Sequence, residues 1–266
     1  MNKTVVITGG ASGQGRSHAL AFANIGYDIV IGDISDPNDI NSNIHKTLQE
    51  IKSTGTNVIG LYCDVRNPED VENLFARAAE EYTTIDIVVA NAGIMLFGMC
   101  WELSEEDVRK TIDINLIGVW RTNKEALKYM IRQKSGRIIN ISSTAGLKPP
   151  SSGVHYAMSK YGVIGLTKTA AREVAGLGIT INAICPTMVR TPMTERKEFV
   201  QDLAKDLGMS FITFEEMNEI LSKRRPMGIA FIEPEDVSNM CIWLATSKEA
   251  KLITGAALPI DAGSML

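Results

Sequence analysis

Short runs of β-branched residues alternate along the chain with longer stretches whose apolar positions recur every three or four residues. The short runs predict strands at Val5–Thr8, Asp28–Gly32, Asn57–Tyr62, Ile85–Ala90, Gly136–Ser142, Ile179–Cys185 and Ala257–Ile260. The longer stretches predict helices, among them Arg16–Ile25, Pro68–Glu81, Glu105–Gln133 and Val154–Leu177. The strand runs are almost continuously apolar, as expected of strands that are buried on both faces. We therefore predict an α/β fold, a Rossmann-like doubly wound parallel sheet of about seven strands with helices on both faces.

One segment departs from this alternation. Thr191–Met227 follows a predicted strand but is long, charged and rich in methionine. No Pro/Ser-rich linker, repeat or low-complexity tract divides the chain, so we predict one domain over residues 1–266. We expect residues 191–227 to be a substrate lid inserted at the carboxyl edge of the sheet, where ligands bind in open α/β folds.

The composition narrows the class of protein. Apolar residues make up 45% of the 266 positions and charged residues 22%, which is typical of a globular protein. The formal net charge of −4 argues against a nucleic-acid partner. Cys63, Cys100, Cys185 and Cys241 are widely separated, so we expect isolated buried thiols in a reducing compartment, without disulfide or metal. No signal peptide and no apolar run of about 18 residues is present, which predicts a cytoplasmic protein without a membrane segment.

A glycine-rich loop follows the first predicted strand. Gly10 and Gly15-Arg16-Ser17 nearly match the phosphate loop of NTPases, but arginine stands where that loop requires lysine. Gly9, Gly13 and Gly15 instead match a spaced dinucleotide-binding loop, whose glycines allow a phosphate to approach the helix N-terminus. Either match alone is weak, and a tight structural turn remains a third interpretation.

Two acidic residues after later strands favour the dinucleotide interpretation. Asp33 ends the second predicted strand about 20 residues after the loop, where a carboxylate accepts hydrogen bonds from an adenosine ribose. It would also repel a 2′-phosphate, which favours NAD over NADP. Asp64 follows the third strand and either meets the adenine edge or caps the next helix.

The strongest chemical pattern is a serine, a tyrosine and a lysine. Tyr156 and Lys160 lie four positions apart and share one helix face, while Ser143 follows the strand that precedes them. A free tyrosine has a pKa near 10, and lowering it by about 2–3 requires roughly 3–4 kcal/mol. We expect the Lys160 ammonium, together with a cationic nicotinamide ring, to supply this stabilisation. Alone, the pair would be typical of a helix surface, but with the glycine loop and Asp33 it indicates catalysis.

Together these motifs resemble the short-chain dehydrogenase/reductase family over essentially the whole chain. The resemblance implies that Tyr156 is the general acid/base, that Lys160 binds the nicotinamide ribose and lowers the tyrosine pKa, and that Ser143 polarises the substrate oxygen. It implies that Asn115 keeps a water molecule in a proton relay. The expected cofactor NAD would contact Gly9, Ser12, Gly13, Gln14, Gly15, Asp33, Ile34, Asp64, Val65, Asn91, Ala92, Gly93, Tyr156, Lys160, Pro186, Thr187, Val189 and Thr191.

The chain departs from the family pattern at three places. Ala90 replaces the first asparagine of the Asn-Asn-Ala-Gly motif, and Pro186-Thr187 replaces Pro-Gly, which we expect to stiffen the nicotinamide loop. Gln14 stands where many members have isoleucine. The stretch Gly13–His18, with Pro-Thr, resembles the branch of carveol-type and related alicyclic alcohol dehydrogenases.

The expected substrate pocket is strongly apolar. Its wall would comprise Ile94–Phe97, Leu147, Val154, Met188 and Met193, although the methionines could equally fill gaps in the core. The expected substrate contacts are Met95, Ser143, Leu147, Tyr156, Met188 and Met193. The expected lid also carries five cations, which could meet a distant anionic tail of the substrate or simply face solvent. They are Lys197, Lys205, Lys223, Arg224 and Arg225.

These features predict an NAD-dependent enzyme that interconverts a bulky alicyclic secondary alcohol and its ketone. A hydroxysteroid of the bile-acid type is our first expectation for the substrate. The alternatives are a carveol-type monoterpene alcohol dehydrogenase, a 3-ketoacyl-thioester reductase and a non-catalytic NAD-sensing regulator. Three segments resemble the family's subunit contacts, namely Glu105–Gln133, Val154–Leu177 and Gly255–Leu266. This resemblance implies a homotetramer, with a dimer as the alternative.

Overall fold

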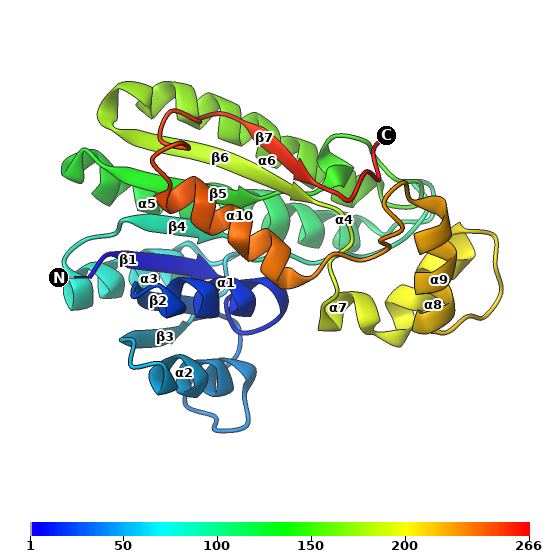
Figure 1. Cartoon of the computed structure of the whole chain (residues 1–266), viewed down its shortest axis with the longest axis horizontal. Helices are drawn as coiled ribbons and strands as arrows, with labels where there is room; N and C mark the ends of the chain where they lie inside the picture. Colours follow the sequence, from blue (N-terminus) through cyan, green and yellow to red (C-terminus); the bar gives the residue numbers. More distant parts are fainter. Residues whose placement is uncertain (1) are drawn as a thin grey trace.

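Seven parallel strands form one sheet in the computed structural model, which describes residues 2–266 (Figure 1). The strands are β1 Thr4–Thr8, β2 Asp28–Asp33, β3 Val58–Tyr62, β4 Ile87–Ala90, β5 Gly136–Ile141, β6 Ile179–Pro186 and β7 Ala257–Ile260. Their order is β3-β2-β1-β4-β5-β6-β7, and each neighbouring pair is parallel. The chain changes direction of winding between β1 and β4, which opens a crevice at their carboxyl ends. The predicted α/β fold with about seven strands is confirmed.

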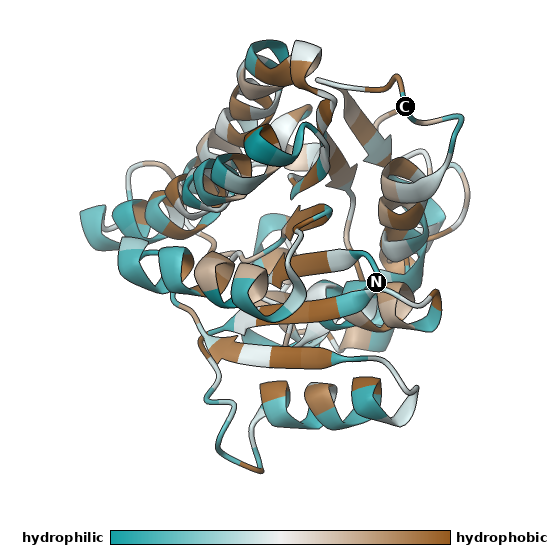
Figure 2. Ribbon diagram, turned by 90° about the vertical axis from the view of Figure 1, so that its left-hand side faces the viewer, coloured by the Kyte–Doolittle hydropathy of each residue, from teal (hydrophilic) through white to brown (hydrophobic). Residues whose placement is uncertain are grey.

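Alternation along each strand directs side chains to two helical layers. On β1, Val5 and Ile7 pack with α1 (Gly13–Asn24), α2 (Asn43–Ser53) and α10 (Pro234–Thr246). Val6 faces the opposite layer, which contains α3 (Pro68–Tyr82), α5 (Val119–Gln133) and α6 (Val154–Val174). Because helices cover both faces of the sheet, the strands are made mostly of apolar residues and are mostly brown in Figure 2. The helices also carry teal, hydrophilic turns.

The helix predicted over Glu105–Gln133 is interrupted. It comprises α4 (Glu105–Ile112), a π-helical segment at Asp113–Gly118, and then α5. At Gly118 the chain packs against Val65 so closely that a Cβ atom would lie 2.6 Å from its side chain. The sequence periodicity does not reveal this π-helical turn, because apolar residues keep the helical spacing across it.

Two further boundaries differ from the prediction. The helix predicted to end at Leu177 ends at Val174 and continues as a short 3-10 turn, Ala175–Leu177. β4 begins at Ile87 rather than Ile85, because the Ile85 backbone bonds to the Gln133 side chain and the Asp86 carboxylate accepts from the Thr4 N–H.

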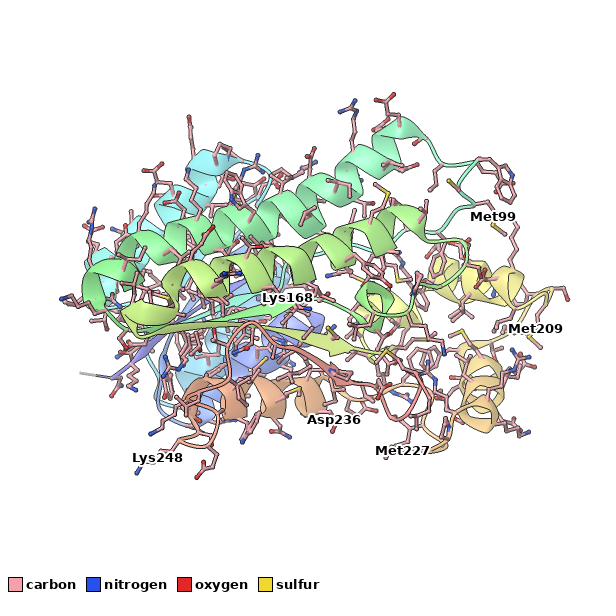
Figure 3. All side chains as sticks on the ribbon, turned by 90° about the horizontal axis from the view of Figure 1, so that it is seen from above. Met99, Lys168, Met209, Met227, Asp236 and Lys248 are labelled. Atoms are coloured by element: carbon pink, nitrogen blue, oxygen red, sulfur yellow. The ribbon has the colours of Figure 1, made fainter. Side chains whose placement is uncertain are left out.

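The segment Thr191–Met227 leaves the sheet, as its composition suggested. It folds into α7 (Pro192–Glu195), α8 (Lys197–Asp206) and α9 (Phe214–Arg224), which stand beyond the carboxyl ends of the strands (Figure 1). This segment has an apolar cluster of its own, which includes Phe199 and Met217. Seen from above, Met209 and Met227 lie at the end of the molecule opposite Lys248 (Figure 3).

The four cysteines are free thiols, and three of them are buried. Cys100 is exposed, so the expectation of a buried thiol is wrong there; it lies in the loop before α4 and not in the sheet. Among residues 2–266, no helix is both long and apolar enough to cross a membrane.

Candidate active site

Two cavities meet at the carboxyl edge of the sheet. The first, about 540 Å³, is lined by the glycine loop, Asp33 and the turn after β4. The second, about 420 Å³, lies between Ser143 and Tyr156 on one side and the α7–α9 segment on the other. Gln14, Thr191 and Met193 line both, so the cavities are neighbours on the same face. Their sizes fall in the range of ligand-binding pockets, roughly 300–1,000 Å³.

The glycine loop is shaped by close contact between β1, α1 and the turn after β4. Gly9 has a φ of 67° and Gly13 a φ of 52°, conformations that favour glycine. A Cβ atom on Gly15 would lie 2.0 Å from the Gly9 carbonyl oxygen. The Asn91 amide donates hydrogen bonds to the carbonyls of Thr8 (3.1 Å) and Gly9 (3.0 Å), which holds the loop in place.

This loop leaves donors free for a phosphate. Ser12 precedes α1 without a side-chain capping bond, and the first turn of the helix carries no acidic residue. Free helix N–H groups and a glycine cradle fit the pyrophosphate of a dinucleotide. Arg16 instead pairs with Glu50 on α2, away from the loop, which disfavours the NTPase interpretation.

Asp33 lies at the carboxyl end of β2, as the ribose prediction requires. Its two carboxylate oxygens accept hydrogen bonds from the Ala11 N–H (3.0 Å) and the Ser35 N–H (3.1 Å). These bonds orient the carboxylate in the wall of the first cavity, next to the exposed Ile34.

Asp64 also lines the first cavity, but its carboxylate is occupied by Arg66. The Arg66 Nε donates to both Asp64 oxygens, at 3.0 and 2.9 Å, and the guanidinium holds the pKa of Asp64 below its usual value. The alternative that Asp64 caps the next helix is wrong, because Asn67 caps α3 by accepting from the Glu69 N–H.

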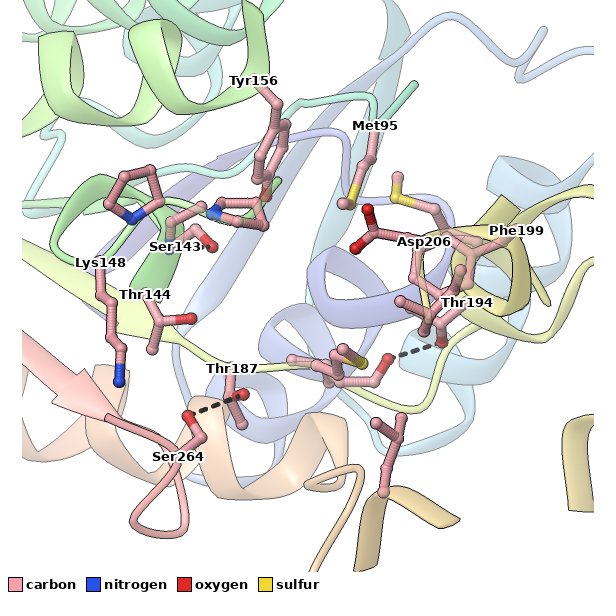
Figure 4. Close-up of a pocket in the computed structure, with 18 of the residues that line it drawn as sticks. Met95, Ser143, Thr144, Lys148, Tyr156, Thr187, Thr194, Phe199, Asp206 and Ser264 are labelled. Carbon is pink, nitrogen blue, oxygen red and sulfur yellow. Dashed lines mark hydrogen bonds between the residues drawn. The ribbon is translucent and has the colours of Figure 1, made fainter. Parts of the chain in front are cut away.

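Tyr156 and Ser143 line the second cavity, and Lys160 lies beside the tyrosine ring. Tyr156 and Lys160 project from one face of α6, and the Lys160 Nζ lies 5.6 Å from the centroid of the tyrosine ring. Ser143, the second residue after β5, lines this cavity together with Tyr156, and its hydroxyl lowers the pKa of the phenol. Ser142 instead donates to the Lys160 carbonyl (3.0 Å), in keeping with a structural role. Figure 4 shows Tyr156 and Ser143 in the same part of the pocket wall.

The pKa of Tyr156 does not shift in the expected direction. Burial raises it above its usual value, and the nearby Ser143 hydroxyl only partly opposes this effect. The expected lowering requires the Lys160 ammonium together with a cationic nicotinamide ring, so it stays a prediction for the NAD-bound protein. The Lys160 amino group is itself buried, donates to the Ile141 carbonyl at 2.9 Å, and has a pKa lowered by burial to about 8.

Asn115 lies in the π-helical segment and is fully buried. Its side-chain oxygen accepts from the Ile94 N–H (2.8 Å), and its amide donates to the Ile94 carbonyl (2.9 Å). The amide is also 3.3 Å from the Ser159 hydroxyl. These hydrogen bonds from Asn115 therefore fix the position of the turn at Ile94, which lies between the two cavities.

Most of the predicted cofactor residues line the first cavity. These are Gly9, Ser12, Gly13, Gln14, Asp33, Ile34, Asp64, Val65, Asn91, Ala92, Gly93 and Thr191. Thr187, Val189 and Tyr156 line the second cavity instead, while Gly15, Lys160 and Pro186 lie outside the walls of both.

Of the predicted substrate contacts, Met95, Ser143, Tyr156, Met188 and Met193 line the second cavity. Leu147 does not line this cavity. A 3-10 turn at Thr144–Gly146 rotates Leu147 outward, where it is 36% exposed and its carbonyl accepts from the Tyr161 hydroxyl. Lys148 and Pro149 take its place in the wall.

The second cavity also contains residues that sequence reasoning did not place there. They are Lys148 after β5, Phe199 and Asp206 on α8, and Ser264 and Met265 in the C-terminal tail. Arg225 was named only among the lid cations. No local pattern indicates these positions, since they meet only when the lid and the tail fold back over β6.

Comparison with known proteins agrees with this arrangement. The family model described as short chain dehydrogenase matches residues 3–201. The chain is 34% identical to a (−)-trans-carveol dehydrogenase of Rhodococcus erythropolis, over 99% of this chain and 98% of that protein. It is 33% identical to a 3-oxoacyl-[acyl-carrier-protein] reductase of Thermotoga maritima, over 99% of this chain and 98% of that protein.

A solved structure is similar over its full length. The crystal structure of a carveol dehydrogenase from Mycobacterium avium in complex with NAD superimposes with a TM-score of 0.92 at 31% identity. The match covers 99% of this chain and 97% of that one. The likeness therefore extends through residues 191–227 and the C-terminal tail as well as the sheet.

Proposed function

Because this chain belongs to the short-chain dehydrogenase family of oxidoreductases, we propose that it uses NAD to interconvert a secondary alcohol and a ketone on a bulky alicyclic substrate. The observation that carries the proposal is the placement of Ser143 and Tyr156 in the wall of one largely apolar cavity, with Lys160 beside the tyrosine ring and the dinucleotide-type loop in the neighbouring cavity. A hydroxysteroid and a monocyclic terpene alcohol are the two candidate substrates. The carveol dehydrogenase relatives favour the second.

The chain's own residues account for the proton chemistry. The Ser143 hydroxyl holds the substrate oxygen, and the Tyr156 phenolate takes the hydroxyl proton of the alcohol. The buried Lys160 ammonium stabilises the phenolate across the tyrosine ring, and Asn115 positions the turn at Ile94 that separates the cavities. NAD bound in the first cavity would supply the hydride acceptor and a positive charge near the phenol.

The substrate class can be tested by following NADH absorbance. The panel is a 3-hydroxysteroid, a monocyclic terpene alcohol and an acyclic secondary alcohol, each with NAD or NADP, and a 3-ketoacyl thioester with NADH or NADPH. We expect NADH formation with at least one cyclic alcohol, because the cavity wall is mainly apolar. Reduction of the thioester with NADPH alone would show a ketoacyl reductase, and NAD binding without turnover would favour the regulator.

Asp33 is proposed to set the preference for NAD. Replacing it by asparagine removes the charge that repels a 2′-phosphate and weakens the ribose contact, which is a charge-assisted hydrogen bond. We expect the ratio of kcat/KM for NAD over NADP to fall by about tenfold or more. The matched control is Asp39→Asn in the loop that follows, where an exposed carboxylate accepts only from the Asn41 N–H. An unchanged ratio in Asp33→Asn would refute the assignment.

We also propose that α7–α9 act as the substrate lid and that the chain forms a homotetramer. Apolar side chains on the long helices support the second proposal. Trp120 on α5 is 45% exposed, and Met158 and Tyr161 on α6 are 52% and 46% exposed. These side chains would be covered in a subunit interface.

A further inference from the structure

One end of the substrate cavity carries several positive charges. Lys148, Arg224 and Arg225 all line it. Arg225, directly after α9, donates from Nη1 to the Thr187 hydroxyl at 2.7 Å, and the Ser264 hydroxyl lies 3.2 Å from the same Thr187 oxygen. Arg225 is thereby held in the wall by the end of β6 and the C-terminal tail. In Figure 4, Lys148 extends toward the Thr187–Ser264 pair.

These charges lack anionic partners in the fold. Within residues 2–266, none of the three forms an ion pair, whereas Lys223 of α9 pairs with Glu219 and Arg190 pairs with Glu233. Asp261 is the acid that acts on Arg225, but its carboxylate is already taken up by the backbone N–H groups of Gly263 and Met265. Burial lowers the pKa of Arg225 and the Asp261 charge only partly opposes this, in accord with a guanidinium that has lost hydration without forming an ion pair.

The single carboxylate in the cavity wall lies on α8. Both the Ser151 and the Ser152 hydroxyls donate to the Asp206 carboxylate at 2.8 Å, so this carboxylate already has hydrogen-bond donors within the protein. Figure 4 shows Asp206 beside Phe199 and Met95, apart from Lys148, Thr187 and Ser264. Apolar side chains including Met188 also line the cavity. A ligand that fits this wall is apolar in its body and negative at the end near Arg225.

We propose that Arg225 and Lys148 form an anion subsite that binds a carboxylate carried by the alicyclic substrate at a distance from its reacting carbinol. The proposal rests on the proposed function and narrows it to hydroxy acids, such as a hydroxysteroid with an acidic side chain. The Arg225 guanidinium uses one nitrogen for Thr187, and its remaining N–H groups suit a carboxylate, whose two oxygens accept side by side.

The test compares two ligands that differ only in charge. They are a 3-hydroxysteroid with a side-chain carboxylate and the same steroid as its N-methylamide. Dissociation constants are measured by calorimetry with NADH present, for the wild type, Arg225→Met and Lys148→Met. Lys223→Met is the matched control, because it removes a cation of α9 that is already paired and does not line the cavity.

We expect the wild type and the control to bind the acid at least about tenfold more tightly than the amide, as charge-assisted hydrogen bonds allow. We expect this preference to fall toward one in Arg225→Met and to weaken in Lys148→Met. No preference in the wild type, or a preference that survives both changes together, would overturn the subsite. Lys148 is exposed, so its variant remains informative even if Arg225→Met unfolds.

Failure of the proposed function would look different. The proposed dehydrogenase activity is measured separately, as NADH formation with the neutral amide and with a simple cyclic alcohol. A protein that oxidises the amide but does not prefer the acid lacks only the subsite. A protein that prefers the acid through Arg225 but oxidises neither alcohol is not the proposed dehydrogenase.

Discussion

Replacing Tyr156 by phenylalanine is expected to lower kcat/KM for alcohol oxidation by about a thousandfold, within the range of general acid–base catalysis, ~10²–10⁴. The change removes one oxygen atom and keeps the ring that packs beside Lys160. The hydroxyl is the group that Ser143 contacts and that receives the substrate proton in the proposed mechanism. Initial rates of NADH formation measure the loss, and titration with NADH should show unchanged cofactor binding.

Tyr161→Phe provides the matched control for this experiment. Tyr161 lies on the same helix, is 46% exposed, and donates its hydroxyl to the Leu147 carbonyl at 2.8 Å outside the cavity. Its variant should lose about 1 kcal/mol of stability at most and retain its rate, since it loses one partly exposed hydrogen bond. Comparable rates in the two variants would show that Tyr156 is not the acid/base.

Lys160→Met is the second change with a large expected effect. We expect kcat to fall by about 10²–10³, because the variant loses a buried electrostatic contact with the reacting group. The wild-type ammonium stabilises the phenolate, and methionine fills similar volume without charge. Because Tyr156 is half-buried and desolvation raises its pKa, loss of the ammonium should move the rising limb of the pH–rate profile to higher pH. An unchanged profile would remove Lys160 from the mechanism.

The same variant has a second readout in the stability of the cofactor-free protein. The folded-state pKa of Lys160 is about 8 and its ordinary value is 10.5, so between these values the unfolded chain binds the extra proton. The Lys160 contribution to the free energy of unfolding therefore rises with pH in this window and is unfavourable below it, by ~3 kcal/mol at 1.36 kcal/mol per pKa unit.

Denaturant unfolding at several pH values measures this contribution. Relative to Lys160→Met, the wild type should become more stable as the pH rises from about 8 to about 10.5. Taking the difference between the two proteins cancels the tyrosines and cysteines, which titrate in both. A difference that stays constant across the window would mean that Lys160 is charged or solvated in the folded state.

The sequence alone determined the fold class and the placement of the glycine loop and of the Tyr156–Lys160 pair, because these depend on local patterns. Apolar runs at strand spacing and helical spacing specify alternating elements, and parallel βαβ units place every strand's carboxyl end on one edge. Gly9, Gly13 and Gly15 mark a loop by their backbone requirements, and Tyr156 and Lys160 share a face by helical geometry. The segment 191–227, which leaves the sheet as α7–α9, was visible as an interruption of that alternation.

Only the tertiary structure decided what surrounds that core. The Thr187 hydroxyl meets Arg225 from 38 positions away and Ser264 from 77 positions away, and no periodicity connects such distant residues. Leu147 was placed in the pocket by its apolar character, but a short 3-10 turn exposes it and brings Lys148 into the wall. The direction of the Tyr156 pKa likewise depends on burial by the whole fold, which sequence spacing does not measure. Local patterns specify elements, whereas desolvation and the polarity of a cavity arise from contacts between elements.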